Sequence, residues 1–294
     1  MTTAPAMIEI RNLARQFGSQ RVLDGITLDV RQGETMVIMG GSGCGKSTLL
    51  RHMVGSLRPT SGSISMLGHN LEELEEDGLD RLRLKFGILY QSGALFNSMT
   101  VFDNVALPLR EHTDLDASTI EIMTKIKLEL VGLREHGNKF PAQISGGMKK
   151  RAGLARALAM DPAILFYDEP SAGLDPVTSA EIDQLILGLT RKLGVTSVVV
   201  THEMDSAFTI ADRMAMLDKG RVLMVGTRDE FDALRKCSDK EAEALSEREQ
   251  LIRQFLRGDA NGPITRRRAL TNYADDLLGF VPAPQSMAAI TPSR

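Results

Sequence analysis

The sequence predicts an α/β fold with a mostly parallel sheet, an antiparallel β part and an inserted helical subdomain. Short apolar segments rich in β-branched residues alternate with helical patterns, which is typical of a parallel sheet. Residues 218–221 form a tight hairpin signal between two such segments. The stretch from about 102 to 159 differs, because it has few strand signals and two helical patterns.

Nine short segments are expected to be strands because they are apolar and are bounded by turn residues. They are residues 7–11, 21–30, 34–39, 63–67, 86–90, 163–167, 196–201, 214–217 and 222–225. Gly220 can take a positive φ and is expected to close the hairpin between the last two.

Helices are predicted from periodicity and capping signals. Apolar residues of one face recur through residues 182–193, and Asp175 before Pro176 is a good start for that helix. The two helical patterns of the insert cover residues 119–131 and 148–160.

Beyond the last strand, Thr227 and Glu230 have the spacing of a capping box that opens a short helix. A highly charged helix is expected over 238–257, stopped by Gly258. We therefore place one domain at 7–240, with the helical subdomain at about 95–160. Residues 241–294 are expected to be a C-terminal helical extension and tail, with one short helix near 267–278.

Composition narrows the function classes. The chain has 294 residues and a net charge of −3, which gives no electrostatic case for nucleic-acid binding. No apolar run approaches the ~18 residues that a membrane-spanning helix needs, and the N-terminus lacks a signal-peptide layout. Two cysteines favour a reducing cytoplasm. If the protein serves a membrane, we expect it to do so from outside the bilayer.

A phosphate-binding loop follows the predicted strand 34–39. The segment fits G-x-x-x-x-G-K-[ST], with the residues Gly40, Gly41, Ser42, Gly43, Cys44, Gly45, Lys46 and Ser47. Glycines let backbone N–H groups approach phosphate oxygens, and the following helix adds positive charge at its N-terminus. Lys46 is expected to reach the β- and γ-phosphates, and Ser47 to bind Mg²⁺. Thr48 is the next ATP-binding candidate, and the core is expected to be that of a P-loop NTPase.

A second motif, which is acidic, follows the predicted strand 163–167. Asp168 is expected to hold Mg²⁺, through water, and Glu169 to polarise the attacking water. A buried strand that merely ends in two acids is the structural alternative. Phe17, ahead of the phosphate-binding loop, is a candidate for stacking on adenine, and a core aromatic is its alternative.

The end of the helical insert resembles the signature of the ABC-type ATPase family. Its residues Ser145, Gly146 and Gly147 precede a predicted helix, an arrangement that offers N–H groups to phosphate. The resemblance implies a head-to-tail homodimer, with each ATP between one subunit's loop and the other's signature. Alone, Ser145 would be read as a helix N-cap.

Further family motifs match by position over roughly residues 7–235. Gln91 resembles the glutamine that touches Mg²⁺ and senses the membrane partner, and residues 171–175 resemble the loop that crosses the dimer interface. His202 resembles the switch histidine that contacts the γ-phosphate. Separate transmembrane permease subunits are implied partners. The resemblance also implies that this chain lies peripherally on the cytoplasmic side of the inner cell membrane.

One departure from the family pattern is informative. Met148 stands where glutamine is usual, and Ser-Gly-Gly-Met resembles the ATPases of the Mla and MCE-linked phospholipid transporters. Residues 91–96, 101–105 and 108–112 strengthen that match, although some of them must pack the subdomain. The resemblance implies maintenance of outer-membrane lipid asymmetry, with an MCE-domain protein and a small STAS-domain protein as partners. It also implies a C-terminal extension that reaches the partner ATPase.

Two alternatives stay open on the sequence. Within transporters, the chain could drive a small-solute importer, for example one for amino acids. The other class is a non-transport ABC protein acting on ribosomes or DNA, but such proteins usually carry two cassettes or a long coiled-coil insert. Neither feature is present in this sequence.

Overall fold

The computed structural model describes residues 4–265 and divides the chain into two compact units. The first comprises Met1–Lys236 and the second Cys237–Arg294. Each is described by itself. The expected short helix near 267–278 and the tail lie outside the described residues.

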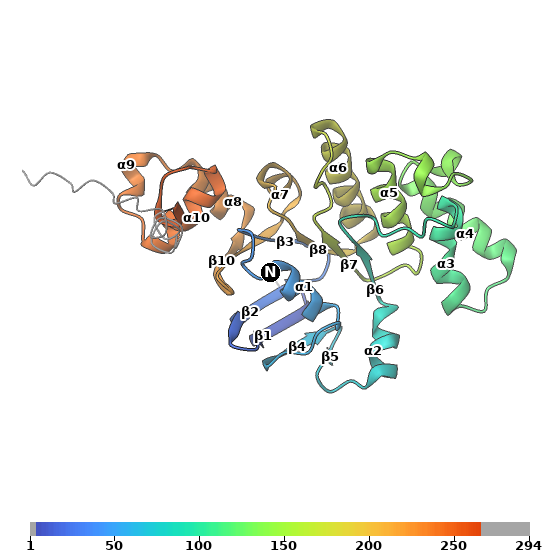
Figure 1. Ribbon diagram of the computed structural model, residues 1–294, viewed down its shortest axis with the longest axis horizontal. Coiled ribbons are helices and arrows are strands. Elements are labelled where there is room, and N and C mark those ends of the chain that lie inside the picture. The colour runs from blue at the N-terminus through green and yellow to red at the C-terminus, as the bar shows by residue number, and fades with distance from the viewer. Residues whose placement is uncertain (1–3, 266–294) are drawn as a thin grey trace, which may run out of the picture. The chain divides into compact units, whose positions relative to one another are not determined.

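The first unit is built around a six-stranded sheet in the order β10-β9-β3-β8-β7-β6 (Figure 1). Its strands are β3 (Thr35–Gly40), β6 (Phe86–Leu89), β7 (Ile164–Asp168), β8 (Thr196–Val200), β9 (Arg213–Asp218) and β10 (Arg221–Thr227). All neighbours pair in parallel except β9 and β10, which form the predicted hairpin. Every residue of β3 and β8 is buried, as expected for parallel strands covered on both faces.

An antiparallel sheet of order β2-β1-β4-β5 confirms the predicted second β part. Its strands are β1 (Ala6–Phe17), β2 (Gln20–Arg31), β4 (Ser61–Met66) and β5 (His69–Asn70). The two-residue β5 was not predicted, because it is too short to carry a periodic signal. Apolar residues of both sheets share one core cluster that includes Ile10, Leu28 and Ile38.

Five helices of this unit lie outside the helical subdomain: α1 (Lys46–Met53), α2 (Glu76–Arg83), α6 (Pro176–Leu193), α7 (Met204–Ile210) and α8 (Arg228–Lys236). The predicted start of α6 is confirmed. Asp175 accepts hydrogen bonds from the amides of Val177 and Thr178, both at 3.1 Å. These bonds satisfy two of the amides that a helix start leaves open.

The helical insert contains three helices, α3 (Val101–His112), α4 (Ala117–Leu130) and α5 (Gly146–Ala157), so the expectation of two was wrong. The missed helix is α3. Pro108 lies inside it, and a proline normally ends a helical pattern because it lacks an N–H. A capping signal was present, since Thr100 Oγ1 accepts from the amide of Asp103 at 3.0 Å.

In the second unit, the single helix expected over 238–257 is two helices, α9 (Asp239–Ala242) and α10 (Glu247–Arg257). The break occurs at Ser246, which has extended backbone angles and caps α10. Its amide donates to Glu249 at 2.8 Å, while the Glu249 amide donates back to the Ser246 hydroxyl at 3.3 Å. This reciprocal capping starts a new helix where charge periodicity alone suggested continuity. Gly258 ends α10 with a φ of 69°, as predicted.

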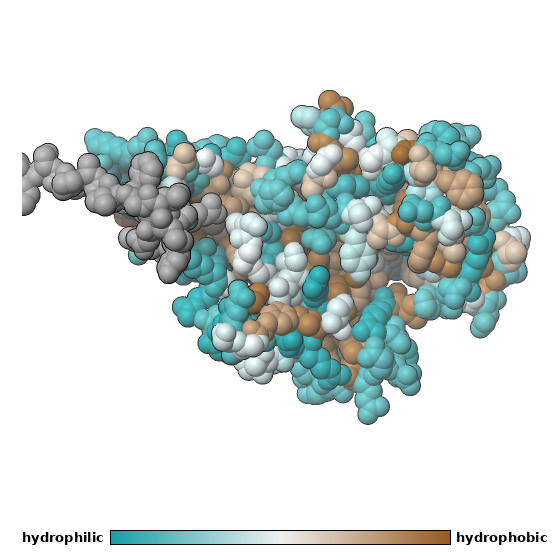
Figure 2. All heavy atoms as spheres, viewed as in Figure 1, coloured by the Kyte–Doolittle hydropathy of each residue, from teal (hydrophilic) through white to brown (hydrophobic). Residues whose placement is uncertain are grey.

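No helix in residues 4–265 has the length and apolarity that crossing a membrane requires. Hydrophilic side chains are spread over the face shown in Figure 2, interrupted by smaller apolar groups.

His52 of α1 makes the stability of the first unit pH-dependent. Its side chain is 1% exposed, and its Nδ1 lies 2.7 Å from the Thr48 carbonyl oxygen. Burial lowers the pKa of this imidazole from its ordinary 6.5. Below about pH 6.5 the unfolded chain therefore takes up a proton that the folded chain refuses, and this group's contribution to stability is lost as the pH falls through the folded pKa.

We expect His52→Gln to make the free energy of unfolding depend less on pH at acid pH. The variant should lose less of its free energy of unfolding than the wild type between pH 7 and pH 5, measured by urea unfolding. Other titrating groups are common to both proteins and cancel in the difference. Parallel curves for the two proteins would contradict the assignment.

Candidate functional site

The predicted site residues from four strands meet at the carboxyl edge of the parallel sheet. Ile38 of β3 and Asp168 of β7 both lie beside Val200 of β8, and Leu89 of β6 lies beside Tyr167. The segments that leave β3, β8, β7 and β6 at this level carry the phosphate-binding loop, His202, Asp168 with Glu169, and Gln91. Ligands bind at this edge in open α/β sheets.

The loop between β3 and α1 is held tightly by neighbouring strands. Gly40 and Gly45 have φ values of 151° and 109°. A Cβ at Gly40 would lie 2.2 Å from the Leu217 carbonyl oxygen, and one at Gly45 would lie 2.7 Å from Leu23 Cδ2. Glycine is therefore required at both positions for the loop to pass between β2 and β9.

Lys46 folds back over this loop. Its ammonium donates to the carbonyl oxygens of Gly40 at 2.8 Å and Gly41 at 3.1 Å. Ser42, Gly43 and Ser47 are exposed around it, while Cys44 is buried. Burial raises the pKa of the Cys44 thiol, which keeps it protonated and unreactive.

The donor set at this edge fits a small hard cation held together with phosphate. Ser47, Gln91 and Asp168 would supply a hydroxyl, an amide and a single carboxylate. Within residues 4–265 there is no cluster of three or more His, Cys, Asp or Glu side chains suited to a metal. Mg²⁺ in nucleotide sites is typically bound by one or two carboxylates plus substrate phosphates, so the residues present fit it.

Asp168 is half-buried beside other charged groups. Burial raises the pKa of its carboxyl, and the charge of Glu169 raises it further, whereas Arg51 and Lys46 lower it. Arg51 of α1 was not among the predicted site residues. Its helix places a positive charge next to the acidic motif.

Glu169 is held at both oxygens by the end of β8. Its Oε2 accepts from Thr201 Oγ1 at 3.1 Å and from the His202 amide at 3.3 Å, and its Oε1 lies 2.8 Å from His202 Nδ1. The carboxylate is largely covered, with 13% of the side chain exposed, whereas the histidine side chain is 61% exposed. Glu169 and His202 are thus brought together as a pair, which the sequence did not predict.

The backbone of Glu169 is unusual as well. Its φ is 49°, a left-handed value that is uncommon outside glycine. On the other side of the backbone, the Lys150 ammonium of α5 donates to the Glu169 carbonyl oxygen at 3.0 Å and to that of Ala172 at 2.8 Å. Lys150 is 5% exposed, and burial lowers its pKa. It was not predicted either.

Ser145, Gly146 and Gly147 form the start of α5. The Met148 amide donates to Ser145 Oγ at 3.3 Å, so the N-cap is confirmed. A Cβ at Gly147 would lie 2.4 Å from Thr178 Cγ2, which shows how closely this turn packs on the start of α6. A Cβ at Gly146 would lie 3.7 Å from Leu174 Cδ2, so the turn packs on α6 and on the residues that lead into it.

Phe17, at the end of β1, is 45% exposed, so the alternative of a core aromatic was wrong. The guanidinium of Arg15 lies 4.5 Å from the centre of its ring. An exposed ring with a cation on one face leaves the other face open to stacking.

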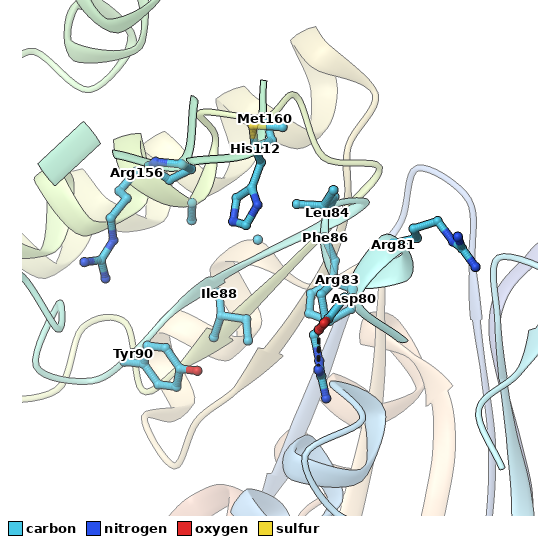
Figure 3. Close-up of a pocket in the computed structure, with 13 residues that line it drawn as sticks. Asp80, Arg81, Arg83, Leu84, Phe86, Ile88, Tyr90, His112, Arg156 and Met160 are labelled. Atoms are coloured by element: carbon cyan, nitrogen blue, oxygen red, sulfur yellow. Dashed lines mark hydrogen bonds and ion pairs between the residues drawn. The ribbon is translucent and has the colours of Figure 1, made fainter. Parts of the chain in front are cut away.

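A groove of about 760 Å³ lies beside the site, between α2, β6 and the helical subdomain. Figure 3 shows Phe86 and Ile88 of β6 and Tyr90 directly after it, with His112 and Met160 on another wall. Asp80, Arg81, Arg83 and Arg156 add charge, and Arg83 pairs with Asp80 at 2.6 Å. Arg156 also donates to the Ala94 carbonyl oxygen at 2.8 Å, in the segment that follows Gln91.

Comparisons with known proteins show which family the chain belongs to. Residues 23–172 match the ABC transporter family model. The chain is 44% identical to the "probable ribonucleotide transport ATP-binding protein mkl" of Mycobacterium leprae, over 87% of this chain and 70% of that protein. It is 39% identical to the "intermembrane phospholipid transport system ATP-binding protein MlaF" of Escherichia coli K12, over 92% and 96%. The protein of that name from Haemophilus influenzae is 37% identical, over 92% and 98%.

Solved structures show the same architecture. A dimeric ATP-binding cassette in a post-hydrolysis state, bound to ADP and phosphate, is 31% identical with a TM-score of 0.70, covering 76% of this chain and 99% of that one. The cassette cbiO1 of Clostridium perfringens is 30% identical with a TM-score of 0.73, covering 80% and 92%. This chain therefore belongs to the ABC transporter family and is an ATP-hydrolysing subunit of that family, with the P-loop NTPase fold predicted for it.

Proposed function

We propose that the chain is the ATPase subunit of a transporter that moves phospholipid between membranes and maintains outer-membrane lipid asymmetry. The observation that carries this proposal is similarity at 37–39% identity over nearly the whole length of two phospholipid-transport ATPases. Ribonucleotide transport is a second candidate, because the mkl relative with 44% identity is named for it.

In each subunit, we assign ATP binding to the phosphate-binding loop and the residues around it. Residues 40–47 and Thr48 would hold the phosphates, Lys46 would neutralise the β- and γ-phosphates, and Phe17 would stack on adenine. Ser47, Gln91 and Asp168 would hold Mg²⁺. When bound, Mg²⁺ supplies charge neutralisation of the phosphate oxygens. The exposed ring of Phe17 and the position of the Lys46 ammonium at the phosphate-binding loop support this arrangement.

Hydrolysis would use Glu169 as general base. A water oxygen attacks the γ-phosphorus in line, its proton passes to the Glu169 carboxylate, and the bond from phosphorus to the leaving ADP oxygen breaks. His202 Nδ1, 2.8 Å from Glu169 Oε1, orients that carboxylate. Its exposed ring can also contact the γ-phosphate.

The signature turn would act in trans. Ser145, Gly146 and Gly147 present the N-terminus of α5, and the two glycines pack on Leu174 and on Thr178 of α6. A head-to-tail homodimer would place this turn against the partner's ATP. The dimeric cassette among the structural relatives supports this arrangement.

The groove beside β6 would receive a cytoplasmic helix of a separate membrane-spanning permease. Its floor is apolar, with Phe86, Ile88 and Tyr90, and its charged rim carries more arginine than acid. An amphipathic helix with an acidic residue has complementary chemistry. The subunit would thus sit peripherally on the cytoplasmic face of the inner membrane, with an MCE-domain protein and a STAS-domain protein completing the complex.

Purification of the affinity-tagged chain from native membranes tests this proposal. We expect a permease, an MCE-domain protein and a STAS-domain protein to co-purify, and mass spectrometry to find bound glycerophospholipid. Co-purification with a solute-binding protein, or ATPase stimulation by a ribonucleotide or an amino acid instead of phospholipid, would overturn it.

An Arg81→Glu variant tests whether the groove is the docking surface for the permease. It reverses charge on the rim without altering the residues assigned to ATP. We expect the variant to lose the permease while the isolated subunit keeps its basal ATPase rate. Retention of the permease would move the docking surface elsewhere.

A further inference from the structure

The turn that follows the acidic motif holds Glu169 in a strained conformation. Glu169 combines a φ of 49° with a following proline, Pro170, and a residue before proline is pushed toward extended conformations. Within the turn, the Ala172 amide donates to the Glu169 carbonyl oxygen at 3.3 Å, and the Glu169 amide donates to the Val200 carbonyl oxygen of β8 at 2.9 Å. Such a conformation persists when the surroundings determine it.

Lys150 holds the carbonyl side of this turn. Its buried ammonium bridges the carbonyl oxygens of the first and last residues of the turn, Glu169 at 3.0 Å and Ala172 at 2.8 Å. Burial lowers its pKa, although the charges of Glu203 and Glu169 favour its protonated form. Burying an ammonium is costly, and the two hydrogen bonds to this turn offset part of that cost.

We propose that Lys150 is a positioning residue for hydrolysis, which fixes the backbone of Glu169 so that its carboxylate reaches the attacking water. The carboxylate is aligned from β8 by Thr201 and His202, and the carbonyl is aligned from α5 by Lys150. The general base Glu169 is therefore held from two sides, by the end of β8 and by α5. One of them, α5, begins with the signature turn at Ser145. The proposal rests on the role of Glu169 in the proposed function.

Lys150→Met removes the ammonium and keeps most of the apolar side-chain volume. We expect kcat to fall by about 10- to 100-fold, because a misplaced base costs rate steeply. KM and ATP affinity should change by less than about threefold, since no ATP-binding group is lost. Lys150→Arg restores a donor and should recover most of the lost rate. It also provides the readout if Lys150→Met fails to fold.

Lys127→Met is the matched control. Lys127 is also buried, at 6% exposed, but it pairs with Asp161 in the helical subdomain, away from the site. Its variant should lose thermal stability while keeping the wild-type kcat. If Lys127→Met lowers kcat as much as Lys150→Met, the effect is one of general packing and the proposal fails.

A double-variant cycle with Glu169→Gln distinguishes the positioning role of Lys150 from the general-base role of Glu169. If Lys150 acts through Glu169, Lys150→Met should add less than about twofold to the loss already caused by Glu169→Gln, in single-turnover measurements. Losses that multiply would overturn the positioning role and leave Glu169 as the base. A Glu169→Gln variant with a nearly normal rate would overturn the base itself.

Discussion

Glu169→Gln is expected to lower ATP turnover by about 10²- to 10⁴-fold, because glutamine cannot accept the proton of the attacking water. The amide keeps the size of the side chain, and its oxygen can still accept from Thr201 and the His202 amide. ATP binding should therefore survive, and the ATP-bound dimer should accumulate. Steady-state ATPase assays and size-exclusion chromatography with Mg-ATP measure the two effects.

Glu181→Gln provides a matched control for this substitution. Glu181 lies on α6, is more than half exposed and pairs with Arg151, and neither residue is among those assigned to ATP. Its variant should keep the turnover within about twofold of wild type, as expected for a surface ion pair. If Glu169→Gln keeps more than about a tenth of the rate, Glu169 is not the general base.

Mixing two inactive variants is expected to restore ATPase activity if the sites form head to tail. Lys46→Ala removes the phosphate contact from one chain, and Ser145→Arg blocks the signature turn of the other. In the mixed dimer, the intact loop of the Ser145→Arg chain faces the intact signature of the Lys46→Ala chain. Random pairing would leave about a quarter of all sites intact.

The control is a mixture of Lys46→Ala with the Lys46→Ala, Ser145→Arg double variant. No pairing in that mixture contains an intact loop, so it should stay inactive. If mixed dimers form, as shown by pull-down with two different tags, and the first mixture also stays inactive, each chain completes its own site.

Most of the fold could be read from local patterns. The predicted strands correspond to observed strands with shifted ends, because short apolar runs between turn residues determine strand identity better than strand limits. The errors have local causes. Pro108 interrupted the pattern of α3, and Ser246 divided a charged stretch that looked continuous. The two-residue β5 has no sequence signal of its own and depends on pairing with β4.

The residues of the candidate site form the same two groups, those that local sequence patterns predict and those that only the folded chain brings together. The sequence by itself predicted the phosphate-binding loop and the acidic motif, because each depends on residue types at fixed short spacing. It predicted the signature through the resemblance of Ser145, Gly146 and Gly147 to a family motif. Tertiary structure alone decided the pairing of Glu169 with His202, the charge of Arg51 near Asp168 and the bridge from Lys150. These contacts join residues far apart in the chain. They follow from strand order and helix packing, which bring distant residues together without leaving a local pattern.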